Sequence, residues 1–435
     1  MTAPDARPAP LPPPRPRATP ATSAANMRSM TTRERLSQLR SAAERELRDD
    51  ILPYWASHAV DEEQGGFVGA VSMAGRPDPT AGKGGVLHAR ILWSYSAALR
   101  RYPDPLYREL ADREFGYLLA HLWDQDFGGL FWEVDHLGRP ANARKQTYGQ
   151  AFGIYGLAEY HRATGNREGL DRAIRLFELI EAHAFDPKAG GYWEARGRDW
   201  QPIDDIRLSD QDMNVPFSMN THLHVLEAYA TLAQVWDDPR PRTRLRLLLE
   251  LFLDRIVDPT TAHQILFFDE QWRSQADIVS YGHDIETSWL LCEAADILGD
   301  ATLQHRTEEL AVRMADVVLA EGFDSDLGGV YNDRADGHLN TDKDWWPLAE
   351  GVVGFLNAYR LSGRAEHLEA ALGSWDFIQR FAIDHERGEW YTRVSRDGVP
   401  YPELTKVDFW KCPYHNTRAM LETIERTRQL ELTAS

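Results

Sequence analysis

The sequence has few cysteines, no long hydrophobic run and no excess of basic residues. Only Cys292 and Cys412 occur among 435 residues, which excludes a disulfide framework and a CxxC zinc or redox pair and favours a reducing cytoplasm. The longest apolar runs, near Val317 and Val352, are far shorter than the roughly 20 residues that cross a bilayer. With 67 acidic against 48 basic residues, the net charge is −19. This charge repels polyphosphates and anionic membranes, so we expect neither nucleic acid nor a membrane as partner.

The first part of the chain differs in composition from the rest. Residues 1–32 are rich in Pro, Ala, Arg and Thr and contain no apolar core of the kind that a secretory signal has. We therefore expect a disordered tail, with Met27 or Met30 as possible true starts. The whole chain is 43% hydrophobic and 11% aromatic, which is enough apolar material for a large core.

A turn motif repeats six times along the chain. Each copy starts with an aspartate, usually continues to Gly-Gly, which supplies positive φ, and ends in an alternating aromatic and polar run. The copies start at Asp61, Asp124, Asp186, Asp258, Asp324 and Asp384, with a weaker copy at Asp258 that has no glycines. Between them lie pairs of segments with helical periodicity. The pattern predicts one all-α domain over residues 33–435, an (α/α)6 barrel with short β-hairpins between helix pairs.

A polar or aromatic cluster opens one amphipathic helix in each repeat. Equivalent positions in a closed ring of repeats lie on the same rim, so we expect these six clusters to converge on one pocket. The clusters are HARILW with Arg90, YGQAFGIY with Tyr148, NTHLHVLEAY with Asn220 and His224, GHDIETSWLL with His283 and Glu286, WWPLAEGVVGF with Trp345, Trp346 and Glu350, and FWKCPYHNTRAML with Trp410 and His415.

Three of the fifteen histidines are candidate catalytic groups, because His224, His283 and His415 each lie in such a cluster. His222 is two residues from His224 and cannot point the same way on a helix, so it is expected to be a supporting hydrogen-bond partner. Glu286 follows His283 at i,i+3, so its carboxylate is expected to hydrogen-bond that imidazole and set its tautomer and basicity. The chain contains neither HExxH nor a Cys/His cluster, and we expect no metal and no cofactor.

Other cluster residues suit a sugar substrate. The aromatic faces of Trp345, Trp346 and Trp410, and of Trp132 after a Gly-Gly turn, are candidate platforms for sugar rings. Arg90 opens a helix among apolar residues, where a buried cation needs a ligand or carboxylate, so we expect it to stabilise an anion.

Several histidines and one arginine, without a nucleophile, phosphate loop or dinucleotide loop, indicate proton transfer at a carbon next to a carbonyl. Imidazole abstracts and returns protons near neutral pH. Two such bases on opposite faces of one carbon permit inversion through an enediolate, whose oxygen Arg90 would stabilise.

The motifs RILW, SMNTHLHVLEAY, SYGHDIETSWLL, WWPLAE and KVDFWKCPYHN resemble the N-acylglucosamine 2-epimerase superfamily from about residue 33 to the C-terminus, and within it the branch that acts on cellobiose. The resemblance implies an (α/α)6 barrel without cofactor that converts the reducing-end glucose of β-1,4-linked disaccharides to mannose, and lactose to epilactose. It implies proton exchange at C2 by His283 and His415, and ring opening assisted by His224. The remaining roles it implies are enediolate binding by Arg90, tuning of His283 by Glu286, and substrate binding by Asn220, Tyr148, Trp132, Trp345, Trp346 and Trp410.

Two positions depart from the pattern of this branch, and several alternatives stay open. Phe131 replaces a common Tyr and Gln146 a common His, so mannose 2-epimerase or mannose isomerase activity on the same barrel is the main alternative. A glycoside hydrolase is a less favoured one, with Glu286 and Glu350 as its carboxylates. A non-catalytic sugar-binding or protein-interaction role is the third. The expected assembly is a monomer or weak homodimer.

Overall fold

The computed structural model describes residues 30–433 of the chain. The expected tail lies mostly outside these residues. Regular structure begins slightly earlier than expected, because the first described helix starts at Thr32. The Thr31 side chain caps this helix, and Glu34 returns the hydrogen bond in a capping box.

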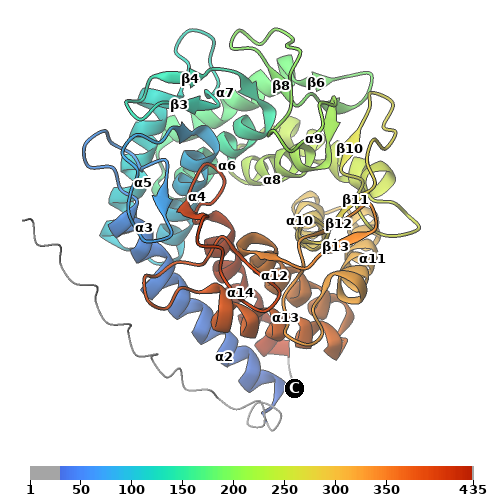
Figure 1. The fold of residues 1–435 in the computed structure, drawn as a ribbon. Coiled ribbons are helices and arrows are strands. Elements are labelled where there is room, and N and C mark those ends of the chain that lie inside the picture. The colour runs from blue at the N-terminus through green and yellow to red at the C-terminus, as the bar shows by residue number, and fades with distance from the viewer. Residues whose placement is uncertain (1–29, 434–435) are drawn as a thin grey trace, which may run out of the picture.

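Six helices form a closed inner ring in which each packs against the next (Figure 1). They are α4 (Gly85–Arg101), α6 (Thr147–Thr164), α8 (Met219–Val235), α10 (Tyr281–Leu298), α12 (Trp345–Ser362) and α14 (Tyr414–Thr433). In α4, α6, α8, α10 and α12 most residues are buried, as expected of helices that are covered on all sides.

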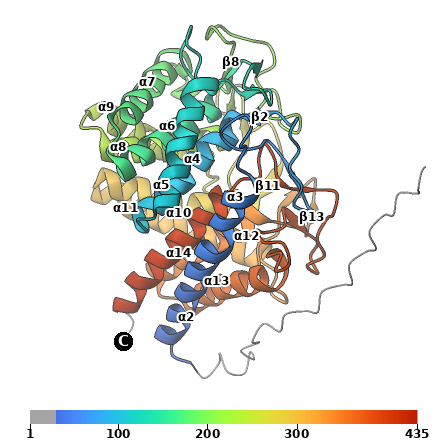
Figure 2. The same cartoon turned by 90° about the vertical axis from the view of Figure 1, so that its left-hand side faces the viewer.

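Outer helices cover the ring, and most of them end in a π-helical turn. They are α2 (Thr32–Arg45) with η1 (Glu46–Ile51) and α3 (Leu52–His58), α5 (Pro105–Tyr117) with η2 (Leu118–Leu122), α7 (Arg167–His183), α9 (Pro239–Leu251) with η3 (Phe252–Ile256), α11 (Ala301–Val317) with η4 (Val318–Gly322), and α13 (Ala365–Phe377) with η5 (Ile378–Ala382). Helix α2 packs against α14, the last inner helix, and Figure 2 shows these two helices side by side. The structure is therefore an (α/α)6 barrel, as the sequence predicts.

Short antiparallel strands join neighbouring repeats at the end of the barrel where the inner helices begin. The strand before each inner helix pairs with a strand after the next turn, and the ring closes between the last repeat and the first. The paired sets are β2 (Lys83–Gly84), β3 (Glu133–Val134) and β4 (Pro140–Asn142); β5 (Lys145–Gln146) and β8 (Ala195–Arg196); β9 (Phe217–Ser218) and β10 (Phe267–Phe268); β11 (Ile278–Ser280), β12 (Asp333–Ala335) and β13 (His338–Asn340); β14 (Lys343–Asp344) and β15 (Arg393–Val394); β16 (Thr405–Val407) and β1 (Val71–Ser72). A local hairpin joins β6 (Phe185–Asp186) and β7 (Gly191–Tyr192). The predicted hairpins are present, whereas the pairing between repeats was not foreseen.

The six aspartate turns have the same construction. Each aspartate Oδ1 accepts the backbone N–H groups two and three residues later, as in Asp61 and the weaker copy at Asp258. In four repeats the other oxygen binds a buried lysine that lies just before the inner helix, and the Nζ–Oδ2 distance is 2.9 Å for Lys145 and Asp124. These pairs tie the turns to the beginnings of the inner helices.

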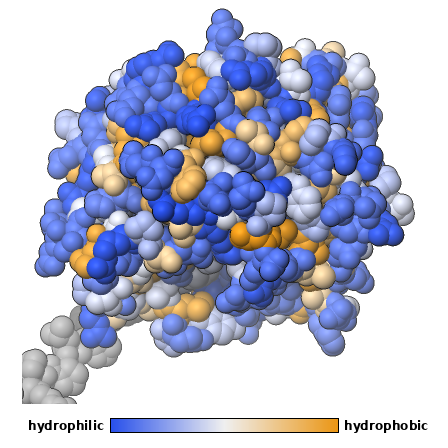
Figure 3. Space-filling view, turned by 90° about the horizontal axis from the view of Figure 1, so that it is seen from above, coloured by the Kyte–Doolittle hydropathy of each residue, from blue (hydrophilic) through white to orange (hydrophobic). Residues whose placement is uncertain are grey.

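The outer surface is mostly polar. Figure 3 shows one face, seen from above, on which hydrophobic residues are scattered in small groups among hydrophilic ones. None of the described helices is long and apolar enough to cross a membrane.

Candidate active site

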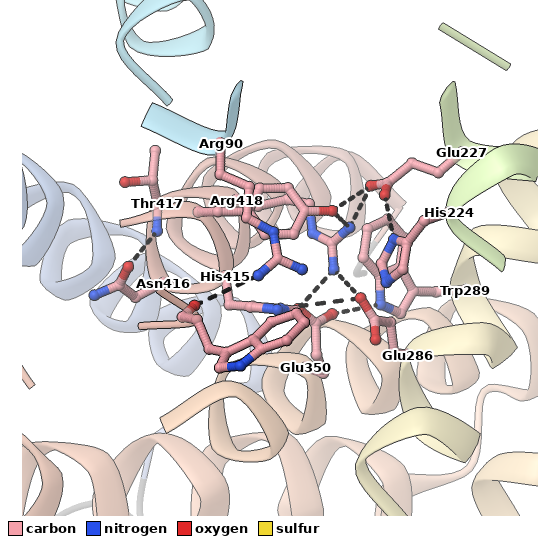
Figure 4. Close-up of polar contacts among 12 residues, drawn as sticks. Arg90, His224, Glu227, Glu286, Trp289, Glu350, His415, Asn416, Thr417 and Arg418 are labelled. Atoms are coloured by element: carbon pink, nitrogen blue, oxygen red, sulfur yellow. Dashed lines mark hydrogen bonds and ion pairs between the residues drawn. The ribbon is translucent and has the colours of Figure 1, made fainter. Parts of the chain in front are cut away.

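Side chains from the first two turns of all six inner helices meet at one end of the barrel (Figure 4). The first helical turn provides Tyr148, Asn220, His283, Trp346 and His415, several of which are half-exposed. One turn deeper, about 5.4 Å along each helix, lie buried charged or ionisable side chains: Arg90, His224, Glu286, Glu350 and Arg418. The convergence predicted from the six clusters is therefore present.

Two of the histidines are held by a glutamate through Nδ1. His224 Nδ1 lies 2.9 Å from Oε2 of Glu227, and His415 Nδ1 lies 2.8 Å from Oε1 of Glu350. Each glutamate accepts a hydrogen bond from Nδ1–H, so the lone pair of each neutral imidazole is on Nε2. Neither Nε2 atom has a hydrogen-bond partner among residues 30–433.

The third histidine has a different partner from the one expected. His283 Nδ1 lies 2.7 Å from Oγ of Ser280, while Glu286 bonds Arg418. The expectation that Glu286 hydrogen-bonds His283 is therefore wrong. The i,i+3 spacing allows such a bond, but the guanidinium of Arg418 is a stronger partner for a buried carboxylate than a neutral imidazole is.

Arg418 is the centre of the buried network. Its Nη1 donates to Glu227, and its Nη2 donates both to Glu286 and, at 2.7 Å, to Oε1 of Glu350. The Tyr414 hydroxyl also donates to Glu227, at 2.6 Å. One guanidinium thus binds the two carboxylates that hold His224 and His415.

The carboxylates differ in acidity. Burial opposes the charged form of Glu227, yet Arg418 and hydrogen bonds from His224 and Tyr414 lower its pKa to about 2. For Glu286, burial and the nearby charge of Glu350 outweigh Arg418 and raise the pKa to about 7. Burial also raises the pKa of Glu350. Glu227 is therefore ionised, and the neighbouring pair Glu286 and Glu350 resists full ionisation.

The imidazoles of His283 and His415 are neutral. Burial, with the charge of His224, lowers the pKa of His283 to about 3. Burial, Arg90 and Arg418 lower the pKa of His415 well below its ordinary value. Neutral imidazoles can accept protons, which is the state that a general base requires.

Arg90 is buried without a carboxylate partner. Its Nη2 donates to Oη of Tyr148 at 2.6 Å, and its guanidinium lies over Phe152 at 4.1 Å and Tyr414 at 5.1 Å. Its Nε has no hydrogen-bond acceptor among the described residues. A buried cation with unused donors suits an anionic ligand.

Aromatic side chains line the opening beside the histidines. The ring of Trp346 lies 4.5 Å from that of His283 and 5.7 Å from that of His415, measured between centroids. The ring centroids of Trp132 and Trp410 lie 5.8 Å apart, so these two indoles are neighbours. The Oδ1 atom of Asn220 is buried and has no hydrogen-bond partner among the described residues.

Other predicted neighbours have structural roles. His222 donates from Nδ1 to the Ser218 carbonyl and accepts the N–H of Tyr192 at Nε2, 2.9 Å away, which confirms its supporting role. Trp345 is buried and lies edge-on to His415.

Glu286, Glu350 and His415 bring three potential metal ligands within 4.8 Å of one another. However, Arg418 Nη2 already donates to both glutamates. Its fixed positive charge lies where a cation would bind, so this trio does not suit a metal ion.

Glu227, Tyr414 and Arg418 belong to the site although they were not predicted from the sequence. Glu227 follows His224 at i,i+3, the same spacing that singled out Glu286, and Arg418 follows His415 at i,i+3. This i,i+3 spacing is the sequence feature that could have identified Glu227 and Arg418.

The barrel with this histidine-containing end defines the class of (α/α)6-barrel carbohydrate isomerases. The chain matches the model of the N-acylglucosamine 2-epimerase (GlcNAc 2-epimerase) family over residues 65–419 and belongs to that family. It is 45% identical over 387 residues to a cellobiose 2-epimerase of Bacteroides fragilis, covering 89% of this chain and 98% of that one. It is 37% identical to a cellobiose 2-epimerase of Dictyoglomus turgidum, covering 90% and 99% of the two chains. The solved cellobiose 2-epimerase of Bacillus thermoamylovorans superposes with a TM-score of 0.85 at 37% identity, covering 90% and 100% of the two chains.

Proposed function

We propose that this isomerase is a cellobiose 2-epimerase, which reversibly epimerises the reducing-end glucose of β-1,4-linked disaccharides at C2. The observation that carries the mechanism is that three imidazoles present unpartnered Nε2 atoms beside a buried arginine without a carboxylate partner. The relatives at 37–45% identity, all cellobiose 2-epimerases, support the disaccharide substrate.

His283 and His415 are the proposed acid–base pair. In the open-chain sugar, one imidazole accepts the C2 proton, and the electrons of the broken C–H bond form a cis-enediolate whose charge lies on the oxygens of C1 and C2. The other imidazole takes up a proton from solvent at Nε2, donates it to the opposite face of C2 and becomes neutral again, while the first imidazole releases the abstracted C2 proton to solvent. The reverse reaction exchanges the two roles, so no external oxidant, reductant or cofactor is consumed.

The surrounding residues stabilise the charges of the enediolate and of the protonated imidazole. Arg90 supplies fixed positive charge for the enediolate oxygens in a buried site, where such an interaction is strong. The carboxylate of Glu350 accepts a hydrogen bond from Nδ1–H of His415, which stabilises that imidazole when it is protonated. His224, held by Glu227, is the proposed acid–base group for opening the pyranose ring.

The sugar-binding residues are proposed from their exposure and free atoms. Trp346 and Trp410 are half-exposed beside the histidines, and Asn220 has an unpartnered amide oxygen. Indole faces bind the C–H faces of sugar rings, and the amide can bind a hydroxyl. Trp132, Trp345 and Tyr148 are the proposed supports around them.

A glycoside hydrolase requires two carboxylates flanking a glycosidic oxygen, roughly 5–5.5 Å or 6.5–9.5 Å apart. The candidates Glu286 and Glu350 are instead bound to a single nitrogen atom of Arg418. Both are fully buried and neither can act independently of the other. The geometry therefore favours proton transfer over hydrolysis.

Both cysteines are free and buried in the structure. We propose on this ground that the enzyme works in a reducing compartment, the cytoplasm, where thiols persist.

The decisive experiment is proton NMR of cellobiose with the enzyme in deuterated water, repeated with mannose. We expect deuterium at C2 together with a mannose-type reducing end, and faster reaction with cellobiose than with mannose. Exchange with mannose alone would instead identify a mannose 2-epimerase or isomerase. Release of free glucose without C2 exchange would identify a hydrolase.

A further inference from the structure

The sixth aspartate turn differs from its counterparts at one backbone position. Five residues after the aspartate, the first, second and fifth turns have glycines with positive φ: Gly66, Gly129 and Gly329. The sixth turn has Glu389 there, with φ +63°. A side chain with a Cβ atom is strained in this left-handed conformation and keeps it only where its surroundings hold it, often at functional sites.

The carboxylate of Glu389 explains why the strained position persists. Glu389 is fully buried. Its Oε1 accepts hydrogen bonds from Lys411 Nζ at 2.7 Å and from Asn416 Nδ2 at 2.7 Å, and its Oε2 accepts one from Trp55 Nε1 at 2.6 Å. Its Oε1 also accepts the N–H of Trp390. Both oxygens of a fully buried charge are thus satisfied, which is the condition for burying one without a large penalty.

Two of these partners belong to the segment that carries candidate site residues. Lys411 follows Trp410 directly, and Asn416 follows His415 directly. The Lys411 ammonium also lies 5.4 Å from the ring centroid of Trp345, whose indole is edge-on to His415 at 6.3 Å. The contacts of Glu389 therefore lead to His415 by two routes. One passes through the side-chain amide of Asn416, and the other passes through Lys411 and Trp345.

The third partner anchors the carboxylate to the opposite end of the chain. Trp55 lies on α3, in the first outer helical segment, and Asp50 of η1 accepts the N–H of Glu389. Glu389 thus connects the first outer segment, the sixth turn and the beginning of α14.

We propose that Glu389 is a positioning residue for the epimerisation, which holds the Trp410–Asn416 segment so that the Nε2 of His415 and the indole of Trp410 are placed for the sugar. This role rests on the proposed function, because it acts through His415. Glu389 itself does not contact the candidate substrate positions. A displacement of about 1 Å at a reacting group can lower a rate about 100-fold.

The test compares three variants by kcat, KM, C2–deuterium exchange and melting temperature. Glu389→Gln keeps the side-chain size but removes the charge that anchors Lys411, and we expect kcat to fall by about 30- to 100-fold with a smaller change in KM. The double variant Glu389→Gln/Lys411→Met removes both charges and leaves no buried ion unpaired, so it keeps the fold testable if the single variant unfolds. We expect its melting temperature to recover while kcat stays low.

Asp61→Asn is the matched control, because it breaks a comparable buried pair, that of Asp61 and Lys83, which makes no contact with His415 or Trp410 among the described residues. It should lower the melting temperature and leave kcat within about twofold. If kcat follows the melting temperature in all three variants, Glu389 is only a stabilising residue and the inference is overturned.

A crystal structure of Glu389→Gln separates this inference from the proposed function. Displaced His415 and Trp345 side chains would support the positioning role even if wild-type enzyme failed to epimerise cellobiose, a result that would refute the proposed function alone. Unchanged positions of these side chains would overturn the positioning role.

Discussion

Replacement of Glu286 by glutamine should make the protein more stable at alkaline pH. Burial and the charge of Glu350 raise the pKa of Glu286 to about 7, against an ordinary value of 4.5, despite the bond to Arg418. A carboxyl group whose pKa is higher in the folded state binds its proton more tightly there. The ionisation of Glu286 therefore does not change the free energy of unfolding well below pH 4.5. It lowers this free energy progressively between pH 4.5 and 7, and by a constant amount above pH 7.

The size of this cost follows from the two pKa values. At 1.36 kcal/mol for each tenfold difference in proton affinity, ionised Glu286 destabilises the fold by about 3 kcal/mol at pH 8 and by less than about 1 kcal/mol at pH 5. Glutamine resembles the protonated acid in shape and has no charge to bury. Glu286→Gln should therefore equal the wild type in stability near pH 5 and exceed it by about 3 kcal/mol at pH 8.

Urea unfolding at pH 5 and pH 8, followed by circular dichroism, measures both free energies of unfolding. Glu109→Gln, an exposed position on the outer helix α5, is the control and should follow the wild-type curve at both pH values. If wild type and Glu286→Gln lose stability in parallel between pH 5 and pH 8, Glu286 does not bear this cost and the reasoning fails.

Three further predictions concern activity. His415→Asn should lower kcat by about 10³-fold and abolish C2–deuterium exchange with cellobiose by NMR; retained exchange would contradict a role in proton transfer. Glu350→Gln should lower kcat by about 10²-fold, because the Nδ1 proton of His415 loses its carboxylate acceptor, and a kcat within threefold of wild type would show that this bond is dispensable. Arg90→Lys should lower kcat by about 10²-fold and raise KM by less, because an ammonium cannot replace the planar donor pair at the enediolate. A change in KM alone would assign Arg90 to ground-state binding.

The barrel could be predicted because each repeat depends on interactions between residues that are close in sequence. The turn aspartates accept N–H groups two and three residues away, and the glycines after them adopt positive φ, so both features depend on residues close in sequence. Most strand pairs between repeats connect residues about 50 positions apart, and the closing pair of β16 with β1 connects residues more than 300 positions apart. No local pattern specifies such partners.

Most of the candidate site was predictable, including Arg90, His224, Glu286 and Glu350 in the second turn of their helices. His224, His283 and His415 stood out because an imidazole near the start of an apolar helix is unusual. Arg418 did not, because its role depends on carboxylates contributed by three other helices. The same guanidinium explains the error at Glu286, since a spacing rule within one helix cannot account for a stronger partner from another.

The packing of α2 against α14, with strand β16 paired to β1, has a consequence for synthesis of the enzyme. A chain emerging from the ribosome can build its helix pairs in order, but His415 and Arg418 follow all the other site residues along the chain. Until they are made, the three carboxylates that bind Arg418 lack this counter-charge, and the first outer helix has no inner partner. Chains that stop before residue 414 should therefore be inactive and depend on chaperones.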